Sequence, residues 1–426
     1  MVRKLLFVLV LCVAALPVPA LAQEASQALR DRAEQVVAML RGQADPAEMF
    51  TAAFLAQVPA TQLRTISGQL TAQYGAPQGV EGIDVRSATA GTLRLGMARA
   101  VLRMDIQIEP NAPHRISGLL VTGADMRGDS LEAVLTEIRA LLGQTSVAVA
   151  RLGDGAPTLL AAHEADRPLA IGSTFKLWIL AELSRQVRVG ERRWSDVVTL
   201  DRRSIPSGTL QNWQHGAPVT LHTLAALMIS VSDNTATDIL LRTLGRENVE
   251  RMMGRIGVEA AARNRPFLST VEMAAIKTGG ADAAAAWRNA DEAGRRRLLE
   301  SAYADLAAER IDLGFFTGNP VLIDSVEWFA SANDLVRTMD WLRRNGDETA
   351  HQILSINPAV GAALRGELDY VGFKGGSEPG VINLTWVVRN REGVWHVVTG
   401  SWNNPAAPVD ESRFVGLMSR AIQQLR

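Results

Sequence analysis

Helical periodicity dominates the chain after residue 23. Between residues 28 and 40, apolar side chains recur every three or four positions, the spacing that places them on one face of a helix. Gly42 follows as a stop signal. The same reasoning predicts two further short helices at residues 46–55 and 60–74.

The period of the pattern then changes. Residues 102–109 alternate strictly between apolar and polar side chains, as in a strand with one face in water. Residues 92–97 and 115–122 predict its neighbours in an antiparallel sheet. Helices followed by such a sheet describe an α+β roll over residues 23–128. This order resembles the nuclear-transport-factor (NTF2)/steroid-isomerase fold. Because no polar constellation in it points to chemistry, we expect a binding or scaffolding module.

A second set of elements fills residues 129–426. Strands are predicted near both ends of this region, with a long helical stretch between them. One mainly antiparallel sheet built from both ends, with helices on both faces, is a three-layer α/β/α arrangement. The expected elements are helices at 130–142 and from Glu411 onward, and strands at 146–151, 158–164, 380–389 and 394–400.

The first 22 residues are typical of an export signal. Arg3 and Lys4 precede an apolar run, and Ala20-Leu21-Ala22 fits a small-residue cleavage site. A membrane anchor is the alternative, but prolines interrupt the run and it is short of a bilayer span. We therefore expect residues 1–22 to be a signal peptide and the product to be periplasmic or secreted.

Composition narrows the chemistry. The single cysteine, Cys12, lies in the signal segment, so the mature chain has no disulfide, thiol nucleophile or cysteine-based metal site. The net charge is −1, which argues against a nucleic-acid partner held by a basic face. The six histidines show no metal-ligand spacing, and no later segment is apolar enough to span a membrane. We expect no metal, no organic cofactor and a small-molecule or peptidoglycan-like substrate; the oligomeric state is open.

The first chemical motif is Gly172-Ser173-Thr174-Phe175-Lys176. Of 44 basic residues only four are lysine, and residue 176 is one of them. Residues three apart share a helix face, and a buried amine can take the proton of a serine nucleophile. Arginine cannot, because its guanidinium stays protonated. At the helix start, the N–H of Ser173 is free to hold a developing oxyanion.

Two further motifs carry polar residues where local structure does not require them. Ser232-Asp233-Asn234 interrupts an apolar segment, and such groups are costly unless hydrogen-bonded. A helix N-cap explains one of the three. Lys374-Gly375-Gly376 precedes a predicted strand, where glycines permit close approach of a substrate backbone. A tight turn with a solvated lysine is the alternative there. Lysines at both Lys176 and Lys374, in an arginine-rich chain, indicate positions that require an amine.

Together these motifs resemble the Ser-x-x-Lys, Ser-Asp-Asn and Lys-Thr-Gly boxes of class A β-lactamases and penicillin-binding proteins. The resemblance covers about residue 130 to the C-terminus. It is closer still to a subgroup in which a steroid-isomerase-like domain precedes the catalytic domain, as in proteins of clavulanic acid clusters.

The resemblance implies a role for each motif residue. Ser173 is the acylated nucleophile and Lys176 its base, while Ser232 relays a proton to the leaving group. Lys374 tunes Ser232 and attracts an anionic group. The implied substrate-binding residues are Asn234, which bonds the substrate amide or the lysine, Gly376, and Ser377, whose N–H joins that of Ser173 in the oxyanion hole.

The departures from the family pattern matter as much. The chain has no Glu-x-x-Leu-Asn box, whose glutamate activates the deacylating water in class A enzymes. Glu272 lies near the expected region, but Ser269-x-x-Glu272 is better explained as a capping box. Gly375 replaces the usual Thr or Ser. An Arg-rich insert at residues 281–310 is taken as surface padding, and the acid Glu327 as part of a solvated face or helix end.

The sequence thus predicts an exported serine hydrolase that acts through an acyl-enzyme at Ser173 on an ester or amide, such as a β-lactam. Fast β-lactam turnover is not expected. The alternatives are a D,D-peptidase or broad esterase, or a periplasmic binding or sensor protein without turnover.

Overall fold

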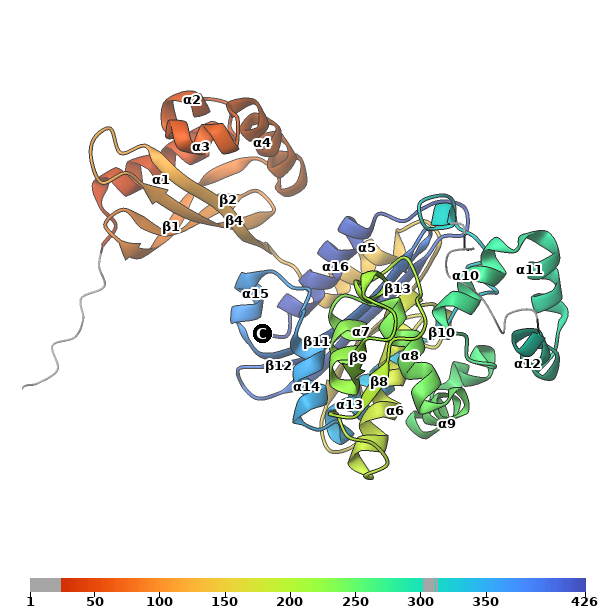
Figure 1. Cartoon of the computed structure of the whole chain (residues 1–426). Helices are drawn as coiled ribbons and strands as arrows, with labels where there is room; N and C mark the ends of the chain where they lie inside the picture. Colours follow the sequence, from red (N-terminus) through yellow and green to blue (C-terminus); the bar gives the residue numbers. More distant parts are fainter. Residues whose placement is uncertain (1–23, 302–310, 312) are drawn as a thin grey trace, which may run out of the picture. The chain divides into compact units, whose positions relative to one another are not determined.

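The computed structural model describes residues 24–301, 311 and 313–426 (Figure 1). The predicted signal peptide and the end of the Arg-rich insert lie outside the described residues. The chain divides into two compact units, Met1–Arg127 and Gly128–Arg426. Among the described helices, none has both the length and the apolar character to cross a bilayer.

The first unit packs helices against one face of a four-stranded antiparallel sheet of order β1-β2-β3-β4. The alternating residues of β3 confirm the predicted amphipathic strand, since Leu102, Met104 and Ile106 are buried against α1. Its elements are α1 (Gln27–Leu40), α2 (Pro46–Met49), α3 (Ala52–Gln57), α4 (Ala60–Tyr74), β1 (Pro77–Ser87), β2 (Ala90–Met97), β3 (Ala100–Ile108) and β4 (Ile116–Met126).

The single helix predicted at residues 46–55 is wrong. Phe50 is extended and forms a bridge to Ile116 of β4, and Thr51 then caps α3 by accepting a hydrogen bond from the Phe54 N–H. Tertiary pairing therefore splits one amphipathic segment into two short helices.

The second unit contains a five-stranded antiparallel sheet of order β11-β12-β13-β5-β6. The first and last strands along the chain meet in its centre, which confirms the prediction of a sheet built from both ends. The strands are β5 (Gln144–Leu152), β6 (Thr158–His163), β11 (Leu368–Glu378), β12 (Val381–Asn390) and β13 (Trp395–Asn403).

Helices cover both faces of this sheet (Figure 1). Val147 and Val149 of β5 belong to the core shared with α5 (Leu131–Arg139) and α16 (Glu411–Gln423). Ala148 and Ala150, on the opposite face of the same strand, belong to the larger core beneath the central helices. Thr145 to Ala150 of β5 are all buried, as in a strand covered on both faces, and this gives the predicted three-layer arrangement.

The central helices build the other layer and the walls of the site. They are α6 (Lys176–Arg188), α7 (Leu221–Ser230), α8 (Asn234–Leu244), α9 (Arg246–Ile256), α10 (Thr270–Thr278), α11 (Gly280–Asn289), α12 (Glu292–Ser301), α13 (Ala332–Asn345) and α14 (Glu348–Ser355). The short helix α15 (Ala362–Gly366) instead contributes Leu364 to the core shared with α5 and α16. Two small pairs of strands accompany them, β7 (Leu169–Ala170) with β10 (Phe329–Ala330), and β8 (Val197–Thr199) with β9 (Pro218–Thr220).

One predicted boundary needs correction because it concerns the site. Lys374 and both following glycines lie inside strand β11, not in a turn ahead of the next strand. The alternative reading of that motif as a turn with a solvated lysine is wrong, since Lys374 is buried.

Candidate active site

Ser173 lies in a short 3-10 turn, η1 (Gly172–Phe175), that leads directly into α6. The turn is held from both sides. Ala170, just before it, exchanges two backbone hydrogen bonds with the side chain of Asn403, at 2.8 and 3.0 Å. Phe175, the last residue of the turn, stacks on Trp328 with ring centroids 3.7 Å apart. The position of Ser173 is therefore fixed by the sheet on one side and by the helical layer on the other.

Two glycines bring this turn against strand β11. A Cβ atom on Gly376 would overlap the backbone N of Ser173 and the carbonyl oxygen of Ile171. Gly172 has φ of +47°, and a Cβ there would lie 3.0 Å from the N of Ser377. Only glycine permits this approach without displacing backbone. As a result, the N–H groups of Ser173 and Ser377 lie in adjacent segments, as an oxyanion hole requires.

Lys176 is fully buried at the first position of α6. Its Nζ donates to the carbonyl oxygen of Ser232 at 2.7 Å, to the Oγ of Ser232 at 3.0 Å and to the Oδ1 of Asn234 at 2.8 Å. Burial, and secondly the charge of Lys374, hold the pKa of Lys176 well below its ordinary value. The amine is thus prepared to act as a base.

Lys374 approaches Ser232 from the other side. Its Nζ donates to the Oγ of Ser232 at 3.1 Å and also to the carbonyl oxygen of Gly375. Burial lowers the pKa of Lys374 to about 7. The Oγ of Ser232 therefore lies between two buried amines. The backbone of Ser232 has φ of +57°, a strained conformation for a residue with a side chain, and such strain is concentrated at functional sites.

The three polar residues of the Ser-Asp-Asn motif divide into two roles. Asp233 is buried and caps α8 by accepting from the N–H of Ala236 at 2.8 Å. It also accepts from the N–H groups of Thr209 and Leu210, at 2.7 and 2.9 Å. The N-cap explanation accounts for Asp233, while Ser232 and Asn234 face Lys176.

These residues surround a cavity of about 370 Å³. Six of the seven predicted site residues line it, and Lys176 lies directly behind Ser232 and Asn234. Phe373 also lines the cavity, and its ring occupies the space beside Gly375, where a Cβ would lie 2.7 Å from it. The predicted lining residues are Ser173, Ser232, Asn234, Lys374, Gly376 and Ser377.

Sequence analysis missed a buried ion-pair cluster in the wall of the same cavity. The Nζ of Lys277 contacts Oε1 of Glu327 at 2.7 Å and also Oε1 of Glu378. Both carboxylates line the cavity. The prediction that Glu327 lies on a solvated face or at a helix end is wrong, since the whole residue is only 4% exposed. The rarity of lysine was the one available signal, because Lys277 is the one lysine after residue 22 that lies outside the motifs.

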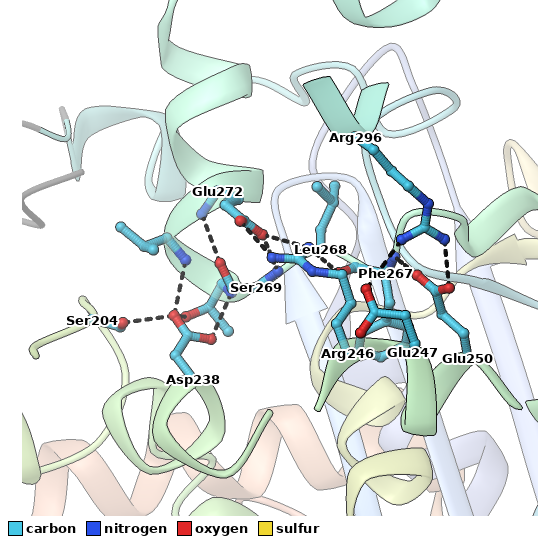
Figure 2. Close-up of polar contacts among 12 residues, drawn as sticks. Ser204, Asp238, Arg246, Glu247, Glu250, Phe267, Leu268, Ser269, Glu272 and Arg296 are labelled. Atoms are coloured by element: carbon cyan, nitrogen blue, oxygen red, sulfur yellow. Dashed lines mark hydrogen bonds and ion pairs between the residues drawn. The ribbon is translucent and has the colours of Figure 1, made fainter. Parts of the chain in front are cut away.

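Glu272 is a structural residue, as the capping box predicts. Its Oε2 accepts from the Ser269 N–H at 2.7 Å, and the Ser269 Oγ accepts in return at 3.3 Å. Figure 2 shows the carboxylate also bound by the guanidinium of Arg246, at 2.7 and 3.0 Å. Glu272 lines a separate cavity of about 490 Å³, which does not include Ser173.

Beside it in Figure 2, Asp238 ties α8 to the start of α10. Its partly buried carboxylate accepts from the N–H of Thr270 at 2.7 Å and of Val271 at 3.1 Å, and from Ser204 Oγ at 2.6 Å. Burial raises the pKa of Asp238 despite these hydrogen bonds. Thr270 lines the Ser173 cavity, so Asp238 positions one wall of it.

Within the residues that the structure describes, no group of three or more histidine, cysteine or acidic side chains is arranged to hold a metal ion.

One protein family and several solved structures match the chain. Several solved structures align with the chain, among them β-lactamases from Sphaerobacter thermophilus (22% identity, 69% of this chain and 96% of that one, TM-score 0.49) and Desulfarculus baarsii (16%, 70% and 98%, 0.48). The structure of PBP-A aligns at 16% identity over 69% of this chain and 93% of that one, with a TM-score of 0.47. No curated protein matches the chain. Residues 130–354, more than half of the sequence, match the family described as "Beta-lactamase enzyme family". The chain belongs to the β-lactamase enzyme family.

Proposed function

We propose that the protein is an exported serine hydrolase that forms an acyl-enzyme at Ser173 with an ester or amide substrate. The observation that carries this proposal is the position of the Ser232 Oγ between Nζ of Lys176 and Nζ of Lys374, at 3.0 and 3.1 Å, in the cavity that Ser173 lines. One ordinary polar contact would be enough for a serine with a structural role. Two amines with lowered pKa values around one hydroxyl are therefore typical of a functional site.

The acylation step follows from this arrangement. Neutral Lys176 takes the proton of the Ser173 hydroxyl as its oxygen attacks the substrate carbonyl carbon. The N–H groups of Ser173 and Ser377 stabilise the negative charge that develops on the carbonyl oxygen. The bond to the leaving group then breaks, and Ser232 gives that group its proton. Lys176 returns a proton to Ser232, so that the relay is restored.

Asn234 and Lys374 support this sequence of proton transfers. Asn234 holds Lys176 through its Oδ1, which keeps the amine oriented. Lys374 donates to the Ser232 hydroxyl, and this lowers the cost of negative charge on that oxygen while the proton moves.

The substrate class follows from the family and from one departure. A β-lactam or a peptidoglycan-like amide fits the family, and an ester fits the same chemistry. The Phe373 ring beside Gly375 replaces the hydroxyl that helps to hold a β-lactam carboxylate in related enzymes, so an ester or amide without that carboxylate is favoured. A D,D-peptidase or broad esterase is the second candidate, and this replacement is the observation that favours it.

The remaining assignments rest on sequence. Residues 1–22 act as a cleavable signal, residues 23–128 form an NTF2/steroid-isomerase-like module of the clavulanic-cluster type that binds or scaffolds, and residues 129–426 carry the chemistry. The location is periplasmic or secreted.

Intact-mass spectrometry after incubation with a penicillin and with an activated ester tests the function. The wild type should gain the mass of the acyl group, and Ser173→Ala should not. Ser230→Ala is the matched control, because Ser230 lines the same cavity but donates its hydroxyl to the backbone oxygen of Ala226. Labelling of the Ser173→Ala variant would refute the assignment. Tight reversible binding without any adduct or turnover would favour a binding or sensor protein instead.

A further inference from the structure

Strand β11 places a second ionisable side chain beside the nucleophile. Side chains alternate along a strand, so Lys374, Gly376 and Glu378 point to the same face of the sheet. Gly376 is the residue that lies against the backbone N of Ser173. Lys374 and Glu378 are each two residues from it, or about 6.6 Å along the strand. Ser173 is therefore flanked by an amine on one side and by a carboxyl group on the other.

The carboxyl group of Glu378 belongs to the buried cluster with Lys277 of α10 and Glu327, which precedes β10. The Nζ of Lys277 donates to Oε1 of both glutamates, and the N–H of Trp328 donates to Oε2 of Glu327 at 3.2 Å. The side chains of Lys277, Glu327 and Glu378 are 0, 0 and 5% exposed. Glu378 is thus held in place at the cavity wall by groups that themselves have fixed partners.

Stability does not account for this cluster. One carboxylate balances the charge of Lys277, and a second buried carboxylate adds a desolvation cost and repulsion between like charges. Burial, and secondly the neighbouring charge of Glu327, raise the pKa of Glu378 well above its ordinary value, although Lys277 opposes the shift. A buried group kept at such a cost beside a nucleophile is typical of an acid or base in catalysis.

We propose that Glu378 is the general base that activates the water which hydrolyses the acyl-enzyme, with Glu327 and Lys277 as positioning residues. This inference rests on the proposed function, because it concerns the second half of the same reaction. It supplies a base where the chain lacks the glutamate box of class A enzymes.

The step balances as follows. A water molecule between Glu378 and the acyl carbon gives one proton to the Glu378 carboxylate while its oxygen bonds to that carbon. The bond between the acyl carbon and the Ser173 oxygen then breaks. The Ser173 oxygen takes a proton from the relay of Lys176 and Ser232, and the acid product leaves. Glu378 finally releases its proton to solvent, and the relay takes one proton back from solvent, so that both return to their starting states.

Acylation and hydrolysis thereby use opposite sides of Ser173. The charged groups that face Glu378 are Lys277 and Glu327, while Lys374 and the exposed Glu411 line the same cavity. Because the two steps depend on different residues, they can be separated by mutation.

The test is Glu378→Gln in the full chain, with the rates of acylation and of adduct loss followed by intact mass and the turnover of an activated ester measured alongside. Acylation should stay within a factor of about 3, while loss of the acyl group slows by about 10²-fold or more, the usual contribution of a general base. In the wild type, hydrolysis should slow as the pH falls through the titration of Glu378, and this dependence should be absent in the variant.

Further measurements distinguish a catalytic role of Glu378 from a structural one, and a failure of this inference from a failure of the proposed function. Glu411→Gln, an exposed residue of the same cavity, should behave as the wild type. Glu378→Gln leaves Lys277 paired with Glu327, so its melting temperature should be unchanged or higher. Unchanged loss of the acyl group in this variant, or an equal fall in both steps with a lower melting temperature, would overturn the inference. A wild type that neither forms an adduct nor hydrolyses the ester would overturn the proposed function itself.

Discussion

Lysine is used where arginine cannot serve. All three lysines of the described residues are buried, and each contacts a residue of the cavity wall. Lys176 and Lys374 have lowered pKa values, because burial is not balanced by a partner carboxylate. In Lys277 burial has the same effect alone, but Glu327 and Glu378 outweigh it and raise the pKa. Identical side chains therefore provide two near-neutral amines and one fixed charge.

Burial of Lys374 predicts a measurable dependence of stability on pH. Its pKa is about 7 when folded and has an ordinary value of 10.5. Between these values the unfolded chain binds a proton that the folded chain does not, so the free energy of unfolding rises with pH in this window. Lys374→Met removes this contribution. Its stability relative to the wild type should therefore fall by about 2 kcal/mol between pH 6.5 and pH 9.

Urea unfolding of both proteins at the two pH values measures this difference. Losses in Lys374→Met that do not depend on protonation are the same at both pH values, so they cancel in the comparison. An equal difference at pH 6.5 and pH 9 would show that Lys374 titrates at its ordinary value in the folded protein.

At the scale of elements, the site depends on contact between strand β11 and turn η1. Gly376→Ala should push this contact apart, because the atoms that a Cβ would overlap are backbone atoms that cannot rotate away. We expect a loss of about 1–3 kcal/mol of stability, as for other overpacked positions, and at least a tenfold slower acylation. Chemical denaturation and intact-mass kinetics measure the two effects.

The matched control is Gly416→Ala in α16, where a Cβ would meet nothing within 4 Å. This variant should gain about 0.5–1 kcal/mol, since glycine is unfavourable inside a helix. If Gly376→Ala acylated as fast as the wild type, close approach of β11 would not be required for the oxyanion site.

The elements also show what the sequence could and could not predict. Helices with strong periodicity, such as α1 and α4, agree with the prediction to within one residue. Strand β11 was missed because Gly372, Gly375 and Gly376 hide its pattern, although glycine is there to allow close approach. Strand β1 was missed for a similar reason, since it contains Pro77 and two glycines.

The residues of the candidate site likewise divide into those that a local pattern revealed and those that it did not. Ser173, Lys176, Ser232 and Asn234 were found because each lies in a short motif whose residues are neighbours in the chain. The cluster around Lys277 has no such motif, because its glutamates are 50 and 101 residues away in sequence. Its partners are set by the packing of α10 against the end of β11, which no local pattern records.

At the scale of the whole molecule, the two units have separate cores. The apolar residues of the first unit form one cluster, and those of Gly128–Arg426 form others with no member from the first. Every described residue that lines the Ser173 cavity belongs to the second unit.

A chain of residues 128–426 should therefore fold, and its rate of acylation should lie within a factor of about 3 of the rate of the full chain, as expected for a domain with its own core. Circular dichroism and intact-mass kinetics test this, and an unfolded or unlabelled fragment would show that the site needs residues 24–127.

The order of the strands has a consequence for how the protein is made. The indole of Trp402 on β13 donates to the carbonyl oxygen of Leu142, 260 residues earlier in the chain, and β13 pairs with β5 in the middle of the sheet. During synthesis, β5 and the nucleophile emerge long before the strand that must lie beside them. The sheet cannot close, and Lys374 and Glu378 cannot reach Ser173, until strands β11, β12 and β13 have been made. The nascent protein should therefore stay inactive and loosely folded until strands β11 to β13 have been released.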